Sequence, residues 1–280
     1  MGTSAGAVAA GYLRSGWGTE DVWRLVMGTH DCLAGLTAAE IDALRAEMFT
    51  PRFRNAPELA RRTVGSTFVL GRSVVRAPAL SVPGWLQRWF PGGLFDMTAA
   101  RRRFATDLPD AWPARPLWLC TVDVANGKRV VLGRPGAPAA DLRRAVLASC
   151  AIPGLYKPVT VGGRVLVDAG ARSDTNLDLA VTEGVDLIVA VAPSTFDPSD
   201  PPARLTQLVR RVATRRLAAE ARFARRAGCP VLLVRPSAAD IGAQGLNFMR
   251  STGWERVALQ AYDTTARMLE TPRFQEALAA

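Results

Sequence analysis

The residues nearest the start of the chain carry the pattern most closely tied to chemistry. Residues 2–6 read Gly-Thr-Ser-Ala-Gly, which matches Gly-x-Ser-x-Gly, the sharp turn that holds a nucleophilic serine between a strand and a helix. This pattern makes Ser4 the candidate nucleophile. Such a turn needs a strand ahead of it, and the sequence offers only Met1 there. Two interpretations stay open: an incomplete start of a hydrolase, or a chance match.

A nucleophilic serine needs a base, and the usual base is a histidine. The chain has one histidine, His30, only 26 residues after Ser4. In the common hydrolase order the histidine comes last, after the acid, so His30 does not fit that role. Asp168 follows a strand predicted over 164–167, and the ends of such strands are where α/β sites collect. From these residues alone, Asp168 is either the base of a two-residue site or an aspartate that caps a turn.

Three segments, taken in order, resemble the patatin-like phospholipase family. They are the turn at 2–6, the run Ala-Ser-Cys-Ala-Ile-Pro-Gly at 148–154, and Val-Asp-Ala-Gly at 167–170. The resemblance covers most of residues 1–30 and 115–270. It implies a serine acyl hydrolase that cleaves acyl esters of lipids through an acyl-enzyme, with Ser4 as nucleophile and Asp168 as base.

The motif positions around this pair are Gly2, Gly6, Ala169 and Gly170. The family usually has glycine where this chain has Ala169, and a methyl group is tolerable there unless the residue needs a positive φ. Family members also carry a glycine-rich loop upstream that holds the oxyanion, and this sequence has none. We therefore expect an N-terminally truncated member in which the N–H of Ala5 supplies part of the oxyanion site. The alternative is an inactive truncated fragment, or a lipid-surface binding protein, that keeps the fold without turnover.

Alternating strand and helix patterns after residue 115 predict an α/β layered domain. Strands over 117–122 and 129–132 are expected to pair through an Asn-Gly turn. A continuous apolar strand over 187–191 is typical of a covered parallel sheet. The predicted helices span 5–14, 19–27, 37–48, 139–150, 204–227 and 254–269.

The resemblance extends this to one patatin-like domain over 1–280. It implies three α/β/α layers around a mostly parallel central sheet, with the first strand and the oxyanion loop missing. Residues from about 50 to 113 are rich in proline and show no sustained hydrophobic period. We expect them to form an irregular insertion that resembles a cap or lid.

The net charge of +10 favours an anionic partner. On the helix predicted over 204–227, one narrow face carries Arg204, Arg211, Arg215, Arg222 and Arg226. This face is either simply solvated or a platform for anionic phospholipid headgroups. No nucleic-acid motif accompanies it, so a lipid or acyl-ester substrate is expected and a nucleic acid is not.

The four cysteines, Cys32, Cys120, Cys150 and Cys229, are widely spaced and form no metal-type pair. The sequence predicts reduced, mostly buried thiols and neither a metal nor a cofactor. No apolar run approaches the roughly 20 residues of a spanning helix, and no signal-peptide pattern is present. We expect a cytoplasmic protein that associates at most peripherally with a membrane.

Overall fold

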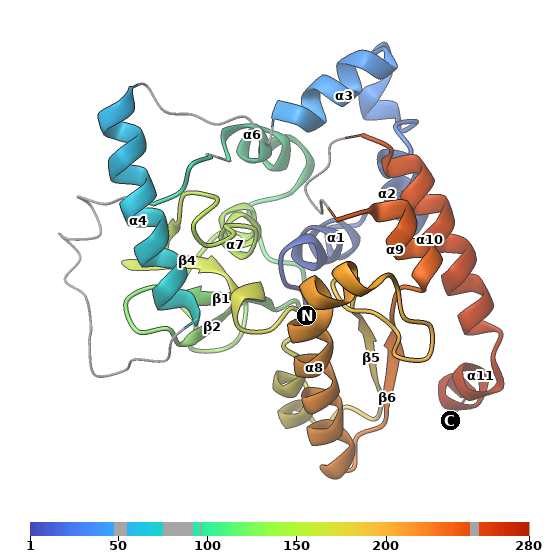
Figure 1. Cartoon of the computed structure of the whole chain (residues 1–280). Coiled ribbons are helices and arrows are strands. Elements are labelled where there is room, and N and C mark those ends of the chain that lie inside the picture. Colours follow the sequence, from blue (N-terminus) through green and yellow to red (C-terminus); the bar gives the residue numbers. More distant parts are fainter. Residues whose placement is uncertain (48–54, 75–91, 96, 247–251, 280) are drawn as a thin grey trace. The chain divides into compact units, whose positions relative to one another are not determined.

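The computed structural model describes residues 1–47, 55–74, 92–95, 97–246 and 252–279 (Figure 1). The chain divides into two compact units, Met1–Arg172 and Ser173–Ala280. Each unit has a hydrophobic core of its own. Both predicted catalytic residues, Ser4 and Asp168, lie in the first unit.

The first unit is built on a four-stranded sheet in the order β2-β1-β4-β3. Strands β1 (Leu119–Asp123) and β2 (Arg129–Leu132) form the predicted antiparallel hairpin. Strand β4 (Arg164–Asp168) lies on the other side of β1, and β3 (Val159–Val161) follows at the edge. All of these pairings are antiparallel, so the expectation of a mostly parallel central sheet is wrong for this sheet.

A short connection is the physical reason for the antiparallel pairing of β3 with β4. Strands β3 and β4 are joined by Gly162 and Gly163, both with positive φ. A two-residue loop joins only antiparallel neighbours, whereas a parallel pair needs a crossover of about a dozen residues or more. Among the described residues of this unit, parallel pairing is confined to two isolated bridges, Gly2 with Leu119 and Phe95 with Tyr156.

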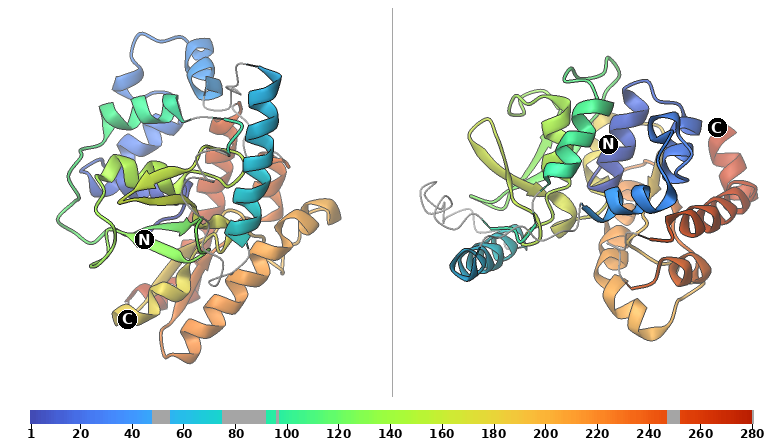
Figure 2. Two further views of the ribbon diagram at one scale, coloured as in Figure 1. Left: turned by 90° about the vertical axis from the view of Figure 1, so that its left-hand side faces the viewer. Right: turned by 90° about the horizontal axis from the view of Figure 1, so that it is seen from above.

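Helices cover this sheet and complete the core of the first unit. Helix α7 packs against β1, β3 and β4, and α1 and α6 pack against α7, as Figures 1 and 2 show from different sides. The most buried core side chains include Leu119, Leu132, Leu142, Val146 and Leu166, which come from β1, β2, α7 and β4. The helical segments of this unit are α1 (Ala5–Arg14), α2 (Thr19–Val26), η1 (Asp31–Leu33), α3 (Ala38–Glu47), α4 (Ala56–Val74), α6 (Thr98–Asp107), α7 (Leu142–Ser149) and η2 (Ala169–Ala171).

The segment from 50 to 113 is more regular than expected, because it contains α4 and α6. Pro57 lies in the first turn of α4, where a missing N–H costs nothing. The side chain of Asn55 accepts a hydrogen bond from the N–H of Glu58 at 2.9 Å, which caps the start of that helix. The proline thus marks a helix start and not an irregular stretch. Residues 75–91 of the predicted insertion lie outside the described residues.

The second unit contains a parallel pair, β5 (Ile188–Val191) and β6 (Val231–Val234). Helix α8 (Arg204–Arg226) lies between these strands in sequence and packs against β6 and η3 (Figure 1). This crossover confirms the parallel pairing predicted for the strand over 187–191. The expectation of a covered strand is wrong, because burial alternates along β5 and both Val189 and Val191 are exposed. The remaining helical segments are η3 (Leu177–Leu179), η4 (Val181–Glu183), α9 (Ala238–Gln244), α10 (Trp254–Leu269) and α11 (Pro272–Ala279).

A buried cation fastens α8 to the segment that follows β5. Arg210 is only 1% exposed, and its guanidinium donates to the carbonyl oxygens of Pro193 at 2.7 Å and Thr195 at 2.9 Å. It also donates to the side chain of Gln244 in α9. Burial lowers the pKa of Arg210 to about 10. One side chain of α8 therefore satisfies acceptors from two other parts of the second unit, the segment after β5 and α9.

Replacing Arg210 tests how much this buried cation contributes to the stability of the second unit. We expect Arg210→Ala to lower the free energy of unfolding by about 3 kcal/mol, because buried carbonyl oxygens lose their donor. The neighbouring Arg211 is exposed on the same helix, and Arg211→Ala should change the free energy by less than about 0.5 kcal/mol. Urea denaturation of the full chain, followed by circular dichroism, measures both. If both variants lost the same free energy of unfolding, the stabilising role assigned to Arg210 would be wrong.

Candidate active site

Ser4 lies in a strained turn between a strand pairing and a helix. The N–H of Gly2 donates to the carbonyl of Trp118 at 2.8 Å, and the Gly2 carbonyl accepts from the N–H of Cys120 at 3.0 Å. Helix α1 begins at Ala5, directly after the serine. Ser4 itself has φ 55° and ψ −122°, a conformation that costs a non-glycine residue about 1–3 kcal/mol. This combination is the strand–turn–helix context that a Gly-x-Ser-x-Gly turn requires.

The two glycines of the motif have different structural roles. A Cβ on Gly2 would lie 2.4 Å from the carbonyl oxygen of Gly6 and 2.7 Å from the nitrogen of Ala7. Position 2 therefore requires glycine so that the chain can pass close to the first turn of α1. A Cβ on Gly6 would meet no other described atom within 4 Å, apart from the helix's own backbone, and Gly6 is not among the residues with positive φ.

The side chain of Ser4 is not used to cap α1. Serine is a favoured N-cap residue because its oxygen usually accepts an N–H of the first helical turn. In the described structure Ser4 precedes α1 without such a bond. Ser4 as a residue is half-buried, and the neighbouring Ala5 is exposed.

The amides of the turn leave one donor for an incoming oxygen. The N–H of Ser4 donates to the carbonyl and the hydroxyl of Ser149, at 3.2 Å and 3.1 Å. The N–H groups of residues 6–8 donate to the carbonyls of Thr3 and Ser4. Of the five amides from 4 to 8, only that of Ala5 lacks an acceptor among the described residues. This is the amide that the sequence assigns to the oxyanion.

Asp168 ends β4 and is 3% exposed. Its side chain accepts a hydrogen bond from the N–H of Gly170 at 2.8 Å, so it also caps the following turn. Ala169 is not among the residues with positive φ. The alanine in place of the family glycine is therefore compatible with this turn, as the sequence analysis required.

The segment 149–151 links the surroundings of Ser4 to those of Asp168. The Ser149 hydroxyl accepts from the N–H of Ser4 and donates to the Cys120 carbonyl at 2.8 Å. The thiol of Cys150 lies 3.5 Å from the Ser4 carbonyl oxygen. The carbonyl of Ala151 accepts from the N–H of Asp168 at 2.9 Å. The sequence analysis identified this segment but gave no role to Ser149, whose contact with the turn joins residues 145 positions apart.

The negative charge of Asp168 also acts on the thiol of Cys150, which contacts the Ser4 turn. Burial raises the pKa of the Cys150 thiol, and the negative charge of Asp168 raises it further. The carboxylate thus acts on a sulfur atom that itself contacts the Ser4 carbonyl. Ser149 and Cys150 thus contact Ser4, and Ala151 contacts Asp168.

The comparison with known families agrees with this geometry. The family model described as patatin-like phospholipase matches residues 1–181, well over half of the chain. The chain belongs to the patatin-like phospholipase family. Membership indicates lipid acyl hydrolase activity, and the matched region includes both Ser4 and Asp168. A comparison with curated proteins finds no match.

Helix α8 of this family member presents a mixed basic and apolar surface. The predicted arginines at 204, 211, 215, 222 and 226 are all exposed. Beside them lie apolar side chains with exposed fractions of 48–63%, namely Leu205, Leu208, Val209, Val212 and Phe223. We call this set the α8 surface.

Among the described residues, no helix has both the length and the apolar character needed to cross a bilayer.

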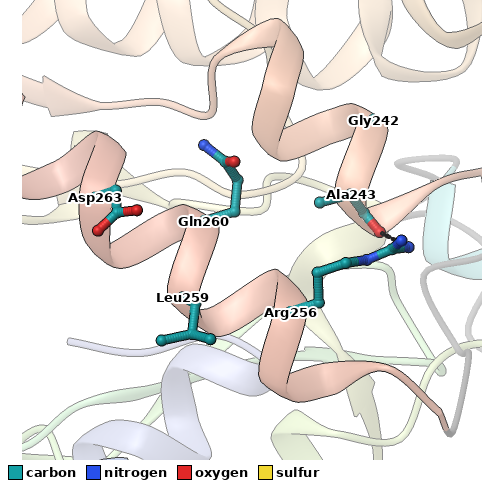
Figure 3. Close-up of a pocket in the computed structure, with 6 residues that line it drawn as sticks. All are labelled: Gly242, Ala243, Arg256, Leu259, Gln260 and Asp263. Carbon is teal, nitrogen blue, oxygen red and sulfur yellow. Dashed lines mark hydrogen bonds between the residues drawn. The ribbon is translucent and has the colours of Figure 1, made fainter.

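A cavity in the second unit contains none of the predicted site residues. It lies between α9 and α10 and has a volume of about 530 Å³ (Figure 3). Its lining residues are Gly242, Ala243, Arg256, Leu259, Gln260 and Asp263. The Arg256 guanidinium donates to the Ala243 carbonyl at 3.4 Å.

Within the described part of the chain, no group of three or more His, Cys, Asp or Glu side chains is arranged to hold a metal.

The different roles of the two motif glycines can be measured directly. We expect Gly2→Ala to lower the free energy of unfolding by about 1–3 kcal/mol, because the new methyl group overlaps the backbone of α1. Gly6→Ala should be neutral or stabilising by about 0.5–1 kcal/mol, since alanine favours a helix more than glycine does. Thermal and urea denaturation of both variants test this. The interpretation is wrong if Gly6→Ala is the more damaging change.

Proposed function

We propose that this patatin-like phospholipase family member hydrolyses acyl esters of lipids through a Ser4–Asp168 dyad. The observation that carries the proposal is the strained Ser4 turn, joined through 149–151 to a buried carboxylate. A residue held in such a conformation persists only where its surroundings fix it, and strain of this kind gathers at active sites. The absence of a histidine after His30 in the sequence is consistent with a base other than histidine.

In the proposed reaction, Ser4 Oγ attacks the carbonyl carbon of the ester while its proton passes to the Asp168 carboxylate. The negative charge that develops on the carbonyl oxygen is stabilised by the N–H of Ala5, the open donor of the turn. The intermediate then expels the alcohol, which takes the proton from Asp168, and leaves an acyl group on Ser4. Asp168 next accepts a proton from water, whose oxygen attacks the acyl carbon. The bond from that carbon to Ser4 Oγ then breaks, Ser4 Oγ takes the proton back from Asp168, and the carboxylic acid is released.

Ser149 has a positioning role in this scheme. Its two oxygen atoms accept from the N–H of Ser4, while its hydroxyl donates to the carbonyl of Cys120 in β1. Through Ser149, the backbone of Ser4 is therefore connected to the sheet whose strand β4 ends at Asp168. We infer that this contact keeps Ser4 Oγ directed towards the substrate and not towards the amides of α1.

The α8 surface supports a second part of the proposal, contact with an anionic lipid interface. Basic side chains near such a surface contribute about 1 kcal/mol each, and neighbouring apolar side chains enter the headgroup region. An exposed strip that combines both kinds of side chain suits this role better than a simply solvated face, which would hold fewer apolar residues. The same surface would serve the alternative function, lipid binding without turnover.

Active-site labelling tests the dyad. A fluorophosphonate probe should modify the wild-type chain at Ser4, and Ser4→Ala should abolish labelling. Asp168→Asn should slow labelling by about a hundredfold or more, because it removes the base but keeps the side-chain shape. Mass spectrometry of the labelled peptide identifies the modified residue. Release of fatty acid from short-chain esters measures ester cleavage.

Matched controls separate chemistry from general damage. Ser199 and Asp186 lie on exposed loops of the second unit, and Ser199→Ala and Asp186→Asn should label at the wild-type rate. A wild-type chain that binds lipid vesicles but is not labelled would support the alternative function. Equal labelling of Ser4→Ala and wild type would exclude Ser4 as the nucleophile.

Vesicle binding tests the α8 surface. We expect Arg211→Glu with Arg215→Glu to weaken binding to vesicles that contain phosphatidylglycerol by roughly 30-fold, from the loss of two contributions of about 1 kcal/mol each. A double change of the same charge, Arg101→Glu with Arg144→Glu, alters exposed residues of the first unit and should have little effect. Co-sedimentation at low and high salt measures both. The surface is not the lipid contact if both double variants lose binding equally.

A further inference from the structure

A second set of reactive groups surrounds Cys32, and none of them belongs to the proposed dyad. Cys32 lies in η1 and is exposed. Its sulfur lies 2.9 Å from Nδ1 of His30 and accepts a hydrogen bond from the guanidinium of Arg103 at 3.0 Å. One exposed thiol thus faces both a base and a cation. Thiols in such partly exposed, electropositive surroundings are the reactive ones in proteins.

The imidazole of His30 is oriented to receive the thiol proton. The N–H of Cys32 donates to Nδ1 of His30 at 3.1 Å, so Nδ1 is an acceptor and the ring proton is on Nε2. Nε2 faces the carboxylate of Asp21 at 3.9 Å. The ring also stacks on Trp17, with 4.7 Å between centroids and 19° between planes. Nδ1 has one lone pair, so proton transfer from sulfur to Nδ1 would displace the hydrogen bond from the Cys32 N–H. The resulting imidazolium would keep its stacking on Trp17 and face the carboxylate of Asp21.

The guanidinium of Arg103 is fixed from its other side. Its Nε lies 2.5 Å from the carboxylate of Asp107, whose side chain is 3% exposed. The hydroxyl of Tyr12 donates to the same carboxylate oxygen. Burial opposes the charge on Arg103, but the hydrogen bond with Cys32 and the charge of Asp107 raise its pKa above the ordinary value. The cation is thus positioned on the sulfur before any reaction takes place.

We propose that Cys32 is a redox modification site, a thiol that hydroperoxides oxidise to sulfenic acid. The sulfur loses its proton to Nδ1 of His30 and attacks the terminal oxygen of the hydroperoxide. The S–O bond forms as the O–O bond breaks, which leaves Cys32 as S–OH. The departing alkoxide takes the proton from His30 and leaves as an alcohol, or as water when the oxidant is hydrogen peroxide. Sulfur is oxidised by two electrons and the peroxide is reduced by two.

Arg103 acts by stabilising negative charge on sulfur and on the departing oxygen during this step. The other cysteines have different surroundings, since Cys120 and Cys229 are buried and Cys150 is half-buried beside the Ser4 turn. The sulfenic acid on Cys32 would remain exposed, where a small external thiol can cap it reversibly. The site depends on none of the residues of the ester-cleaving proposal.

Kinetic trapping of the sulfenic acid tests the proposal on the full chain. The reduced protein is treated with hydrogen peroxide at pH 7 in the presence of dimedone, and each cysteine is quantified by mass spectrometry over time. We expect Cys32 to be labelled before Cys150. Arg103→Gln should slow labelling of Cys32 about tenfold, the effect of losing one charge-assisted hydrogen bond to the reacting sulfur. His30→Gln should slow it as well.

The adjacent Arg102 provides the matched control. It lies on the same helix, and its guanidinium pairs with Glu47 at 2.6 Å instead of with sulfur. Arg102→Gln should therefore leave the labelling rate of Cys32 unchanged. The proposal is overturned if Arg102→Gln and Arg103→Gln, both with wild-type circular dichroism, are labelled at the same rate. If Arg103→Gln does not fold, an unchanged rate in His30→Gln overturns it instead, and a slower rate with Arg102→Gln unaffected supports it.

Discussion

The backbone strain at Ser4 is the constraint on which the proposed site depends. A φ of 55° at a residue with a side chain costs free energy, so it persists only where neighbouring bonds fix the turn. Gly2 supplies two of these bonds through its pairing with β1, and the first turn of α1 supplies others. Ser149 adds a third attachment at the nitrogen of the strained residue. The turn is thus held by a strand, a helix and the end of a second helix.

Strand β1 is the common support for these attachments. Cys120 donates to the carbonyl of Gly2 through its N–H and accepts the hydroxyl of Ser149 through its carbonyl. The next residue, Thr121, stands opposite Asp168 in the register of β1 and β4. Two consecutive residues of one buried strand therefore connect the Ser4 turn to the Asp168 carboxylate. The core of the first unit positions the site through this strand, since all five residues of β1 are buried.

The correct predictions of the sequence analysis rest on local sequence patterns. The bounds of α1 (Ala5–Arg14) and α10 (Trp254–Leu269) match the helices expected from periodicity and helix stops. The end of β4 at Asp168 follows from a short apolar strand before a turn. The antiparallel pairing of β3 with β4 was missed, because it depends on the two-residue connection and not on hydrophobicity. Helix α4 was missed because Pro57 was interpreted as a sign of irregular structure and not as a residue of the first helical turn.

Contacts between distant residues could not be read from the sequence at all. Cys32 and Arg103 are 71 positions apart, and no local pattern places a guanidinium on that sulfur. Composition suggested four similar thiols, yet Cys150 is half-buried beside a carboxylate that opposes its ionisation, while Cys32 faces a cation and an imidazole. The same residue type thus has different surroundings in one unit. Environment decides which side chain reacts, for these thiols as for the serine whose hydroxyl is not used as a helix cap.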